Sequence, residues 1–235
     1  MDAKLNRRHS LAVAALAAWP PTWTSAWAQA FPAADAMAPP PALLLQNVPA
    51  VPVSLANRMA AYTEFRGHVF LDWHPTRAEM LVGHRAAGAS TTQLFRLGRA
   101  LGDFQPGTQD TEPASAGTYE PAAGRYIVFS RSTGGNEVTQ LFRQGLDGAP
   151  AVQITHRDER NELIGWRKPQ GELVYTSLPI DRTAQGGSRA VVMTTFWAVN
   201  PEASDPLAQR RMLMELEGGG WDGSVSEDGL RLALT

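Results

Sequence analysis

The stretch that decides the fold is Thr92-Gln93-Leu94-Phe95-Arg96, which recurs unchanged 47 residues later as Thr139-Gln140-Leu141-Phe142-Arg143. Aromatic residues recur in step with it. Trp73, Tyr119 and Trp166 are spaced by 46 and 47 residues, and each stands two or three residues before a proline. Because a period near 47 is typical of β-propeller blades or of paired-helix solenoids, the chain is predicted to be a repeat protein.

Local patterning within each period favours strands. The aromatic positions are followed by the short apolar runs Met80-Leu81-Val82, Tyr126-Ile127-Val128-Phe129 and Leu173-Val174-Tyr175-Thr176. These runs are too short for helices, follow polar turns that contain Gly or Pro, and are rich in β-branched or aromatic residues. They therefore predict one strand in each period.

Three further strands complete the period. Gln140–Arg143 alternates polar and apolar residues, as a strand with one covered face does. A Gly-containing turn leads from it to Val152–Thr155, and Leu163–Trp166 carries the next aromatic position. Four strands in 47 residues are typical of one propeller blade.

Two other architectures compete with the propeller. A helical solenoid needs runs of about 10 or more residues at helical spacing, which the frequent Gly and Pro residues prevent. A flat β-sandwich explains the short strands and turns but not a repeat that stays in phase over three units. The fold class predicted is therefore all-β, a propeller of four-stranded blades.

The predicted organisation has three parts. Residues 1–30 read as a signal peptide, residues 31–54 as an Ala/Pro-rich linker, and residues 55–235 as the propeller domain. The first part has a basic segment, a short apolar core and small residues at the cleavage position, which is the order of an export signal. The alternative, an N-terminal helix of the mature fold, conflicts with Pro20 and Pro21, which end a helix.

The export signal resembles a twin-arginine signal in part. Arg7-Arg8 is followed by His9-Ser10-Leu11, where Ser10 replaces the usual bulky residue, so the export route stays open. Cleavage follows Ala28 or Ala30. The expected localisation is periplasmic or secreted.

Composition excludes several classes of function. Cleavage removes three of 21 basic and one of 23 acidic side chains, which leaves a net charge of −4 and no cluster of Lys and Arg for nucleic acid. Cys is absent, so disulfides, thiolate metal sites and a Cys nucleophile are excluded. No apolar run after the first 30 residues is long enough to span a membrane.

A search for catalytic motifs finds no candidate residue. The Gly-x-Ser-x-Gly elbow is absent, because Gly88-Ala89-Ser90 continues as Thr91-Thr92 and Gly187-Ser188 as Arg189-Ala190. We therefore expect no catalytic residue, no bound cofactor and no metal site in this chain.

The histidines outside the signal do not have the i, i+4 spacing of a helical zinc site. They are His68, His74, His84 and His156. His68 and His74 could converge in space, but polar residues at strand ends and turns explain isolated histidines better.

Three other features have structural interpretations. Gly134-Gly135-Asn136-Glu137 precedes a strand rather than a helix, which indicates a hairpin turn and not a phosphate loop. Asp158–Glu162 is interpreted as a solvated loop, with a binding contact at the propeller rim as the alternative. Trp73, Trp166 and Trp197 are expected to fill space between blades.

Several segments resemble the start of the propeller in secreted bacterial prolyl oligopeptidase-family serine peptidases. They are Ala61-Tyr62-Thr63-Glu64-Phe65-Arg66, Phe70-Leu71-Asp72-Trp73-His74-Pro75, and the Gly134–Glu137 turn with the strand after it. The likeness covers roughly residues 55–235. The blade turns are also similar to those of TolB-like propellers.

The resemblance implies that an α/β-hydrolase domain with Ser, Asp and His follows the propeller in the intact protein. That domain is absent from this sequence, so no catalytic residue is carried over. An adjacent Glu-Glu pair, which dipeptidyl peptidases of this family use to hold a substrate amino terminus, is also absent. The partners that the resemblance implies are the hydrolase domain and short peptides.

The propeller is expected to be incomplete, with about three and a half blades, whereas closed propellers have about four to eight. A fourth unit begins with the turn Ser226-Glu227-Asp228-Gly229 before Leu230–Leu234. Ile180–Ala190 reads as an insertion, and Leu207–Leu216 as either a loop or a strand pair.

The function expected is that of a noncatalytic propeller segment resembling the substrate-gating domain of such a peptidase. The alternative is a stand-alone TolB-like periplasmic propeller that binds a protein partner. A weaker third possibility, an enzyme that acts in the central channel, needs convergent His or carboxylate side chains that the sequence does not identify.

Overall fold

The computed structural model describes residues 35–180 and 192–235. These residues form two compact units, one that ends at Phe65 and one that begins at Arg66. The predicted signal peptide and the insertion after Ile180 lie outside the described residues. Each unit is described separately.

The first unit contains one helix, α1 (Val53–Thr63). Pro52, which is extended at φ −63° and ψ 139°, precedes it, and the Glu64 N–H closes its last turn on the Ala60 carbonyl. Leu, Met and Ala residues favour the helix. The helix crosses the predicted boundary between the linker and the propeller domain at residues 54/55, and this division of the chain stays a prediction. The first strand begins at His68. No helix in the described part of the chain is long and apolar enough to cross a membrane.

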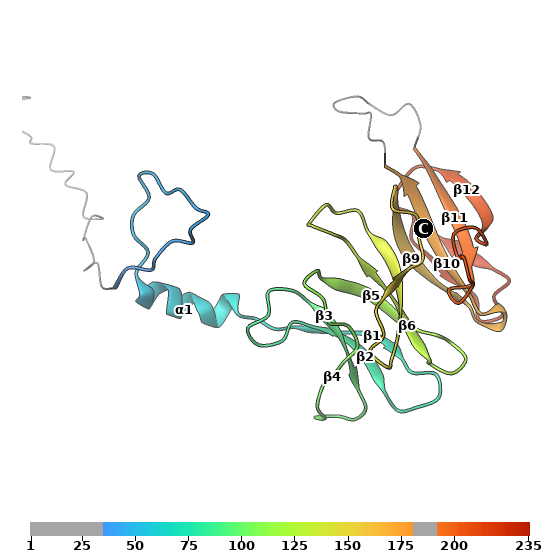
Figure 1. The fold of residues 1–235 in the computed structure, drawn as a ribbon, viewed down its shortest axis with the longest axis horizontal. Helices are drawn as coiled ribbons and strands as arrows, with labels where there is room; N and C mark the ends of the chain where they lie inside the picture. Colours follow the sequence, from blue (N-terminus) through green and yellow to red (C-terminus); the bar gives the residue numbers. More distant parts are fainter. Residues whose placement is uncertain (1–34, 181–191) are drawn as a thin grey trace, which may run out of the picture. The chain divides into compact units, whose positions relative to one another are not determined.

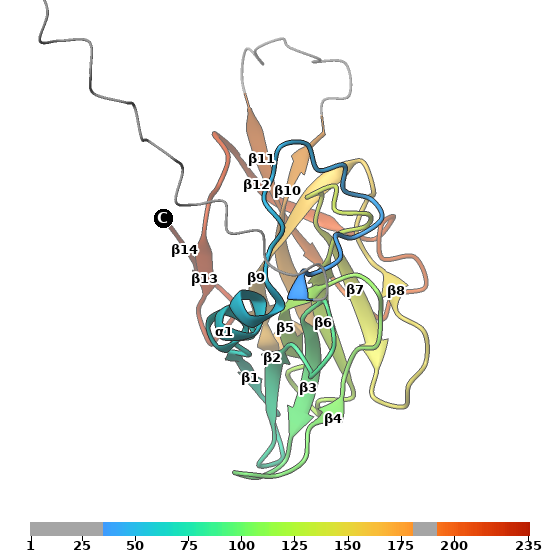
Figure 2. The same ribbon diagram turned by 90° about the vertical axis from the view of Figure 1, so that its left-hand side faces the viewer.

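The second unit contains three four-stranded antiparallel sheets and a hairpin, which are labelled in Figures 1 and 2. Blade A consists of β1 (His68–Trp73), β2 (Met80–His84), β3 (Gln93–Leu97) and β4 (Gln105–Pro106). Blade B consists of β5 (Ala114–Tyr119), β6 (Tyr126–Arg131), β7 (Gln140–Gly145) and β8 (Val152–Gln153). Blade C consists of β9 (Glu159–Arg167), β10 (Glu172–Pro179), β11 (Met193–Val199) and β12 (Arg211–Glu217). The hairpin that follows consists of β13 (Gly223–Val225) and β14 (Leu232–Leu234).

The sheets follow one another as the blades of a propeller do. In each blade the strands pair in chain order, and the first strands of blades B and C pack against the blade before them. Figure 1 shows the three sheets spread as a fan. The prediction of an all-β, partial propeller is therefore confirmed.

The repeat in the sequence corresponds to a repeat in strand register. Trp73, Tyr119 and Trp166 lie at or next to the ends of the first strands of blades A, B and C and stand opposite Met80, Ile127 and Leu173, respectively. The residues before them, Asp72, Thr118 and Gly165, also occupy equivalent positions, opposite Leu81, Val128 and Val174. Residues can therefore be compared position by position between blades.

Two hydrophobic cores join the blades. The core between blades A and B contains Leu81 and Leu94 from blade A, and the core between blades B and C contains Trp166 and Tyr175 from blade C. Strand β6 contributes to both, because Ile127 and Phe129 belong to the first core and Tyr126 and Val128 to the second. Burial on both faces explains why its sequence is continuously apolar rather than alternating.

The turns agree with the sequence. Gly134 and Gly135 have φ values of 62° and 67°, which confirms a hairpin turn. Gly229 in the turn between β13 and β14 has φ 70°. The segment predicted at Leu207–Leu216 as a loop or a strand pair is a turn followed by the single strand β12.

Candidate functional site

A cavity of about 580 Å³ lies where the first strands of successive blades meet. Its wall contains residues from all four first strands: Asp72 and Trp73 from β1, Thr118 and Tyr119 from β5, Ile164, Gly165 and Trp166 from β9, and Ser224 and Val225 from β13. Because the first strands of propeller blades surround the axis, we call it the axial cavity. Lys168 also lines it.

A hydrogen-bond relay crosses the wall of the axial cavity. Trp166 Nε1 donates to Thr118 Oγ1 over 3.1 Å, and Thr118 Oγ1 donates to Asp72 Oδ2 over 2.7 Å. Asp72 also accepts from the backbone N–H of Tyr119 and of Trp73. The relay links blades A, B and C, and it occupies the Asp72 carboxylate with hydrogen bonds.

A histidine lies behind the same wall. His74 is buried, and its ring contacts that of Tyr119 at 4.9 Å between centroids. Burial lowers the pKa of His74, and Arg77 lowers it further. Its Nδ1 accepts a hydrogen bond from the Thr76 N–H, which leaves Nε2 to carry the proton of the neutral ring.

The shape of the turn beside His74 depends on Gly124. Its φ is 64°, and a Cβ built on it would lie 2.2 Å from His74 Nε2. Glu120 closes this turn by accepting from the N–H groups of Ala122, Ala123 and Arg125. Burial alone would raise the pKa of Glu120, but these hydrogen bonds outweigh it and lower that pKa.

The repeated pentapeptide holds the link between blades. Gln93 donates to the carbonyls of Asp110 and Glu112 at 3.1 and 2.8 Å, and it accepts from Thr108 Oγ1 at 2.8 Å. Thr108 Oγ1 in turn accepts from the Leu94 N–H. Because this link enters the next blade, we call the arrangement the glutamine clamp.

The clamp recurs 47 residues later. Gln140 donates to the carbonyls of Arg157 and Glu159 at 3.5 and 2.7 Å and accepts from Thr155 Oγ1 at 2.9 Å. Asn161, whose side chain is fully buried, also donates to Gln140 Oε1 over 3.1 Å. The identical pentapeptides therefore reflect one structural task performed at two blade junctions.

Blade C does not repeat the clamp and contains an ion pair between its own residues. Thr195 stands at the position of Gln140 in the strand register, and Arg210 pairs with both carboxylate oxygens of Glu159 at 2.7 and 3.0 Å. The Arg210 guanidinium also stacks over the Trp197 ring at 4.0 Å. The third unit thus departs from the repeat both in sequence and in the contacts made at this position.

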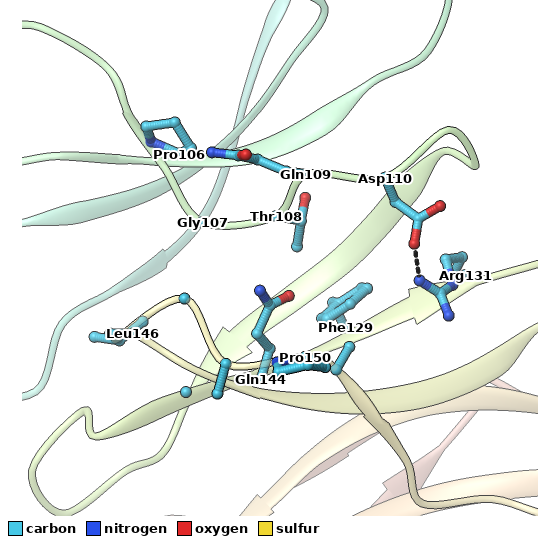
Figure 3. A pocket seen from close by; sticks show the side chains of 14 residues that line it. Pro106, Gly107, Thr108, Gln109, Asp110, Phe129, Arg131, Gln144, Leu146 and Pro150 are labelled. Atoms are coloured by element: carbon cyan, nitrogen blue, oxygen red, sulfur yellow. Dashed lines mark hydrogen bonds and ion pairs between the residues drawn. The ribbon is translucent and has the colours of Figure 1, made fainter.

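A second cavity, of about 490 Å³, lies between the link Pro106–Asp110 and blade B. Figure 3 shows Thr108 and Gln144 pointing into it from opposite sides, with Phe129 beside them. Arg131 forms an ion pair with Asp110 at its edge and stacks over Phe142 at 3.9 Å. Since its single cation is already paired, this cavity lacks a free charged group.

The histidines do not assemble into a metal site. The structure brings together His68 and His84, whose rings stack at 4.2 Å, instead of His68 and His74, and Phe104 stacks against both. His156 lies elsewhere, where its Nδ1 accepts from the Asp158 N–H. Among the described residues no group of three or more His, Cys, Asp or Glu side chains could hold a metal ion.

Two interpretations of single segments need correction. Asp158–Glu162 is not a solvated loop, because Glu159 begins strand β9, pairs with Arg210, and is followed by the buried Asn161. Trp166 and Trp197 do pack in the core between blades B and C, but Trp73 is 58% exposed. No sheet covers Trp73 in the described part of the second unit.

One residue of the repeated pentapeptide indicated the glutamine clamp, although searches for catalytic motifs do not consider it. Gln is the one polar residue of the pentapeptide that is buried in both copies. A buried polar side chain must be hydrogen-bonded, so its recurrence indicated a structural partner. The relay had no such signal, because its members Asp72, Thr118 and Trp166 differ in type.

The sequence matches no protein-family model and no curated protein. Among solved structures it is similar to TolB from Acinetobacter baumannii, with 17% identity over 72% of this chain and 37% of that one at a TM-score of 0.50. A prolyl endopeptidase, from a structural and mechanistic analysis of two such enzymes, matches with 12% identity over 76% of this chain and 28% of that one at a TM-score of 0.51. A TolB-like protein from Agrobacterium tumefaciens matches at 17% identity over 65% and 51%, with a TM-score of 0.49.

These similarities show the fold, a β-propeller of the kind found in TolB and in the prolyl endopeptidase. The chain spans about half or less of the length of the structures that it matches. The identities are too low to carry an activity from those proteins to this one.

Proposed function

We propose that this chain is a noncatalytic propeller segment that serves as the substrate gate of a secreted, prolyl oligopeptidase-like serine peptidase. The observation that carries the proposal is the axial cavity, which is lined by the first strands of three successive blades and by β13 of the hairpin. Gating by such a cavity is steric, because it admits short peptides and keeps folded proteins from a catalytic serine in the neighbouring hydrolase domain.

The chemistry of the cavity supports a passive role. Its carboxylate, Asp72, is held by hydrogen bonds from the relay, and burial keeps the pKa of His74 low. A volume of about 580 Å³ falls within the range of roughly 300–1,000 Å³ that suits small ligands. The walls therefore offer shape and hydrogen-bonding groups.

Peptide occupancy of the cavity can be tested by obstruction. Ser224 is exposed and lines the cavity, so Ser224→Trp fills part of it, whereas Ser115→Trp places the same side chain at an exposed position of β5 outside it. We expect short peptides to bind the parent and the Ser115 variant alike and the Ser224 variant less, as measured by equilibrium dialysis. Equal binding by all three would contradict the gating role.

The catalytic part of the proposal has two tests. The DNA that follows codon 235 should encode a Gly-x-Ser-x-Gly motif and a later His. The purified 235-residue chain should not hydrolyse peptidyl or ester chromogenic substrates. Serine-dependent turnover by this chain would contradict the proposal.

The alternative is a TolB-like periplasmic propeller that binds a protein partner, and the structural similarity to TolB favours it. Further blades that end in a stop codon would support this alternative.

Both functions require export through residues 1–30, which we propose act as a cleaved signal. Sequencing the amino terminus of the periplasmic protein should place the cleavage after Ala28 or Ala30, and Arg7-Arg8→Lys-Lys should block export only if the twin-arginine route is used.

A further inference from the structure

Gln144 departs from the repeat at a position that is otherwise apolar. By strand register its equivalents in blades A and C are Leu97 and Val199. Val199 is 1% exposed and packs in the core between blades B and C. Because burial of an aliphatic side chain here stabilises the fold, packing does not explain why blade B has a carboxamide at this position.

The Gln144 carboxamide is also unpaired. The residue is partly buried, and its amide group has no hydrogen-bond partner among the described residues. Figure 3 shows it pointing into the cavity of about 490 Å³ between the link Pro106–Asp110 and blade B, which we call the link cavity. Gln109 lines the opposite side, and its carboxamide is likewise unpaired within the described part of the chain. Because polar groups in folded proteins are normally hydrogen-bonded, two unpaired carboxamides in the wall of one cavity indicate a ligand.

The equivalent cavity at the next junction provides a comparison. It has a volume of about 310 Å³ and lies at the link between blades B and C. His156, which stands 47 residues after Gln109, accepts a hydrogen bond from the Asp158 N–H there, and Gln153 donates to the Thr155 carbonyl over 2.9 Å. The imidazole and carboxamide groups of that cavity are thus used within the protein, in contrast to those of the link cavity.

The groups that line the link cavity favour an uncharged ligand. Its single cation, Arg131, is paired with Asp110, so a charged ligand gains no free partner. Strand β7 is paired on both edges, with β6 and β8, so this wall offers no open strand edge to an extended peptide. The free groups are carboxamides, each of which both donates and accepts hydrogen bonds. Hydroxyl groups on adjacent carbon atoms of a sugar do the same and therefore match them.

We propose that the link cavity binds a small uncharged sugar, which the carboxamides of Gln144 and Gln109 hold by hydrogen bonds. The volume of the cavity falls within the range of roughly 300–1,000 Å³ that suits small ligands. This binding site does not depend on the proposed gating function, because the link cavity and the axial cavity share no lining residue.

The experiment measures sugar binding to the 235-residue chain by saturation-transfer NMR. The probes are glucose, galactose, mannose and N-acetylglucosamine, with glucuronate as a charged comparison. We expect saturable binding of at least one neutral sugar. Gln144→Leu and Gln109→Leu should each weaken that binding about tenfold, since each removes a carboxamide that makes about two hydrogen bonds.

Two variants control for general effects. Gln105→Leu changes an exposed glutamine of the neighbouring strand β4 that does not line the link cavity. Ser224→Trp obstructs the axial cavity instead. Both variants should bind the sugar as the parent does. Loss of binding in Ser224→Trp would overturn the proposal, because the sugar would then occupy the axial cavity.

Thermal unfolding separates the loss of a binding group from misfolding. Gln144→Leu should raise the unfolding midpoint, because it restores the apolar residue found at the equivalent positions, while it weakens sugar binding. A lowered midpoint would overturn the proposal, because the carboxamide would then contribute to the fold. Binding that persists in both the Gln144 and the Gln109 variants, binding of glucuronate alone, or no binding of any of the four neutral sugars would overturn it as well.

Discussion

Replacing Gln140 with Ala tests the claim that the glutamine clamp fixes the link between blades. The substitution removes the donation to Glu159 O at 2.7 Å and the acceptance from Thr155 Oγ1 at 2.9 Å and from Asn161 Nδ2 at 3.1 Å. At about 1 kcal/mol of net stability for each hydrogen bond, and with Thr155 and Asn161 left buried, we expect a loss of about 2–4 kcal/mol.

The assay is urea unfolding followed by circular dichroism. With a slope of about 2 kcal/mol per M, the midpoint should fall by about 1–2 M. Gln93→Ala should cause a somewhat smaller fall, because its clamp has the equivalent carbonyl and threonine partners at blade junction A–B but no counterpart of Asn161. Gln144→Ala is the matched control. Its partly exposed side chain takes part in no clamp, so the change should stay within about 0.5 kcal/mol.

A double-mutant cycle separates the clamp from simple loss of packing. Thr155→Val keeps the shape of the side chain but removes the hydroxyl that both donates to Gln140 and accepts from the Leu141 N–H. The double variant should lose less stability than the two single variants together, because the residues share one hydrogen bond. Strict additivity, or a loss at Gln140 no larger than that at Gln144, would refute the reasoning.

Three further predictions concern the turn, the pH dependence and the edge of blade C. Gly124→Ala should destabilise the chain by more than about 1 kcal/mol in thermal unfolding, because φ is 64° and the new Cβ would lie 2.2 Å from His74 Nε2. Folding lowers the pKa of Glu120 from its ordinary value of 4.5, so the ionised carboxylate stabilises the folded chain fully above about pH 4.5. This stabilisation is lost as the pH falls through the lowered pKa of the folded state. Glu120→Gln should therefore flatten the fall in stability below about pH 4.5. Arg210→Met should cost about 1–3 kcal/mol in urea unfolding, because it leaves the largely buried carboxylate of Glu159 unpaired.

Matched variants control these measurements. Gly148→Ala has a similar φ of 84° but no atom within 4 Å of the new Cβ, so it should report the backbone cost alone. Arg160→Met breaks the exposed pair with Glu162 and should change stability by less than about 1 kcal/mol. If either control matched its test variant, the clash with His74 or the burial of Glu159 would not be the cause.

The sequence was most informative where burial repeats. Strand β6, the hairpin at Gly134–Gly135 and the phase of Trp73, Tyr119 and Trp166 were all predictable, because apolar runs, positive φ and large rings each leave a residue signature. These local signatures sufficed for the fold class. They did not require knowledge of which blade lies next to which.

Features that depend on neighbours from distant parts of the chain were not predictable. Asp158–Glu162 looks solvated because its charges are visible in the sequence, while Arg210, which pairs with Glu159, lies 51 residues away. Trp73 has the same residue signature as Trp166, yet its exposure depends on whether another sheet covers it. The relay from Trp166 to Asp72 likewise joins three unlike residues that only the register brings together.

Strand β6 places alternate side chains in two different cores. In an array of repeats, stability is approximately the sum of the intrinsic stability of each unit and of the interfaces between nearest neighbours. Here unfolding of blade B would expose the core faces of blades A and C at the same time. Calorimetry of the second unit should therefore give one sharp endotherm for its three sheets, with equal calorimetric and van't Hoff enthalpies.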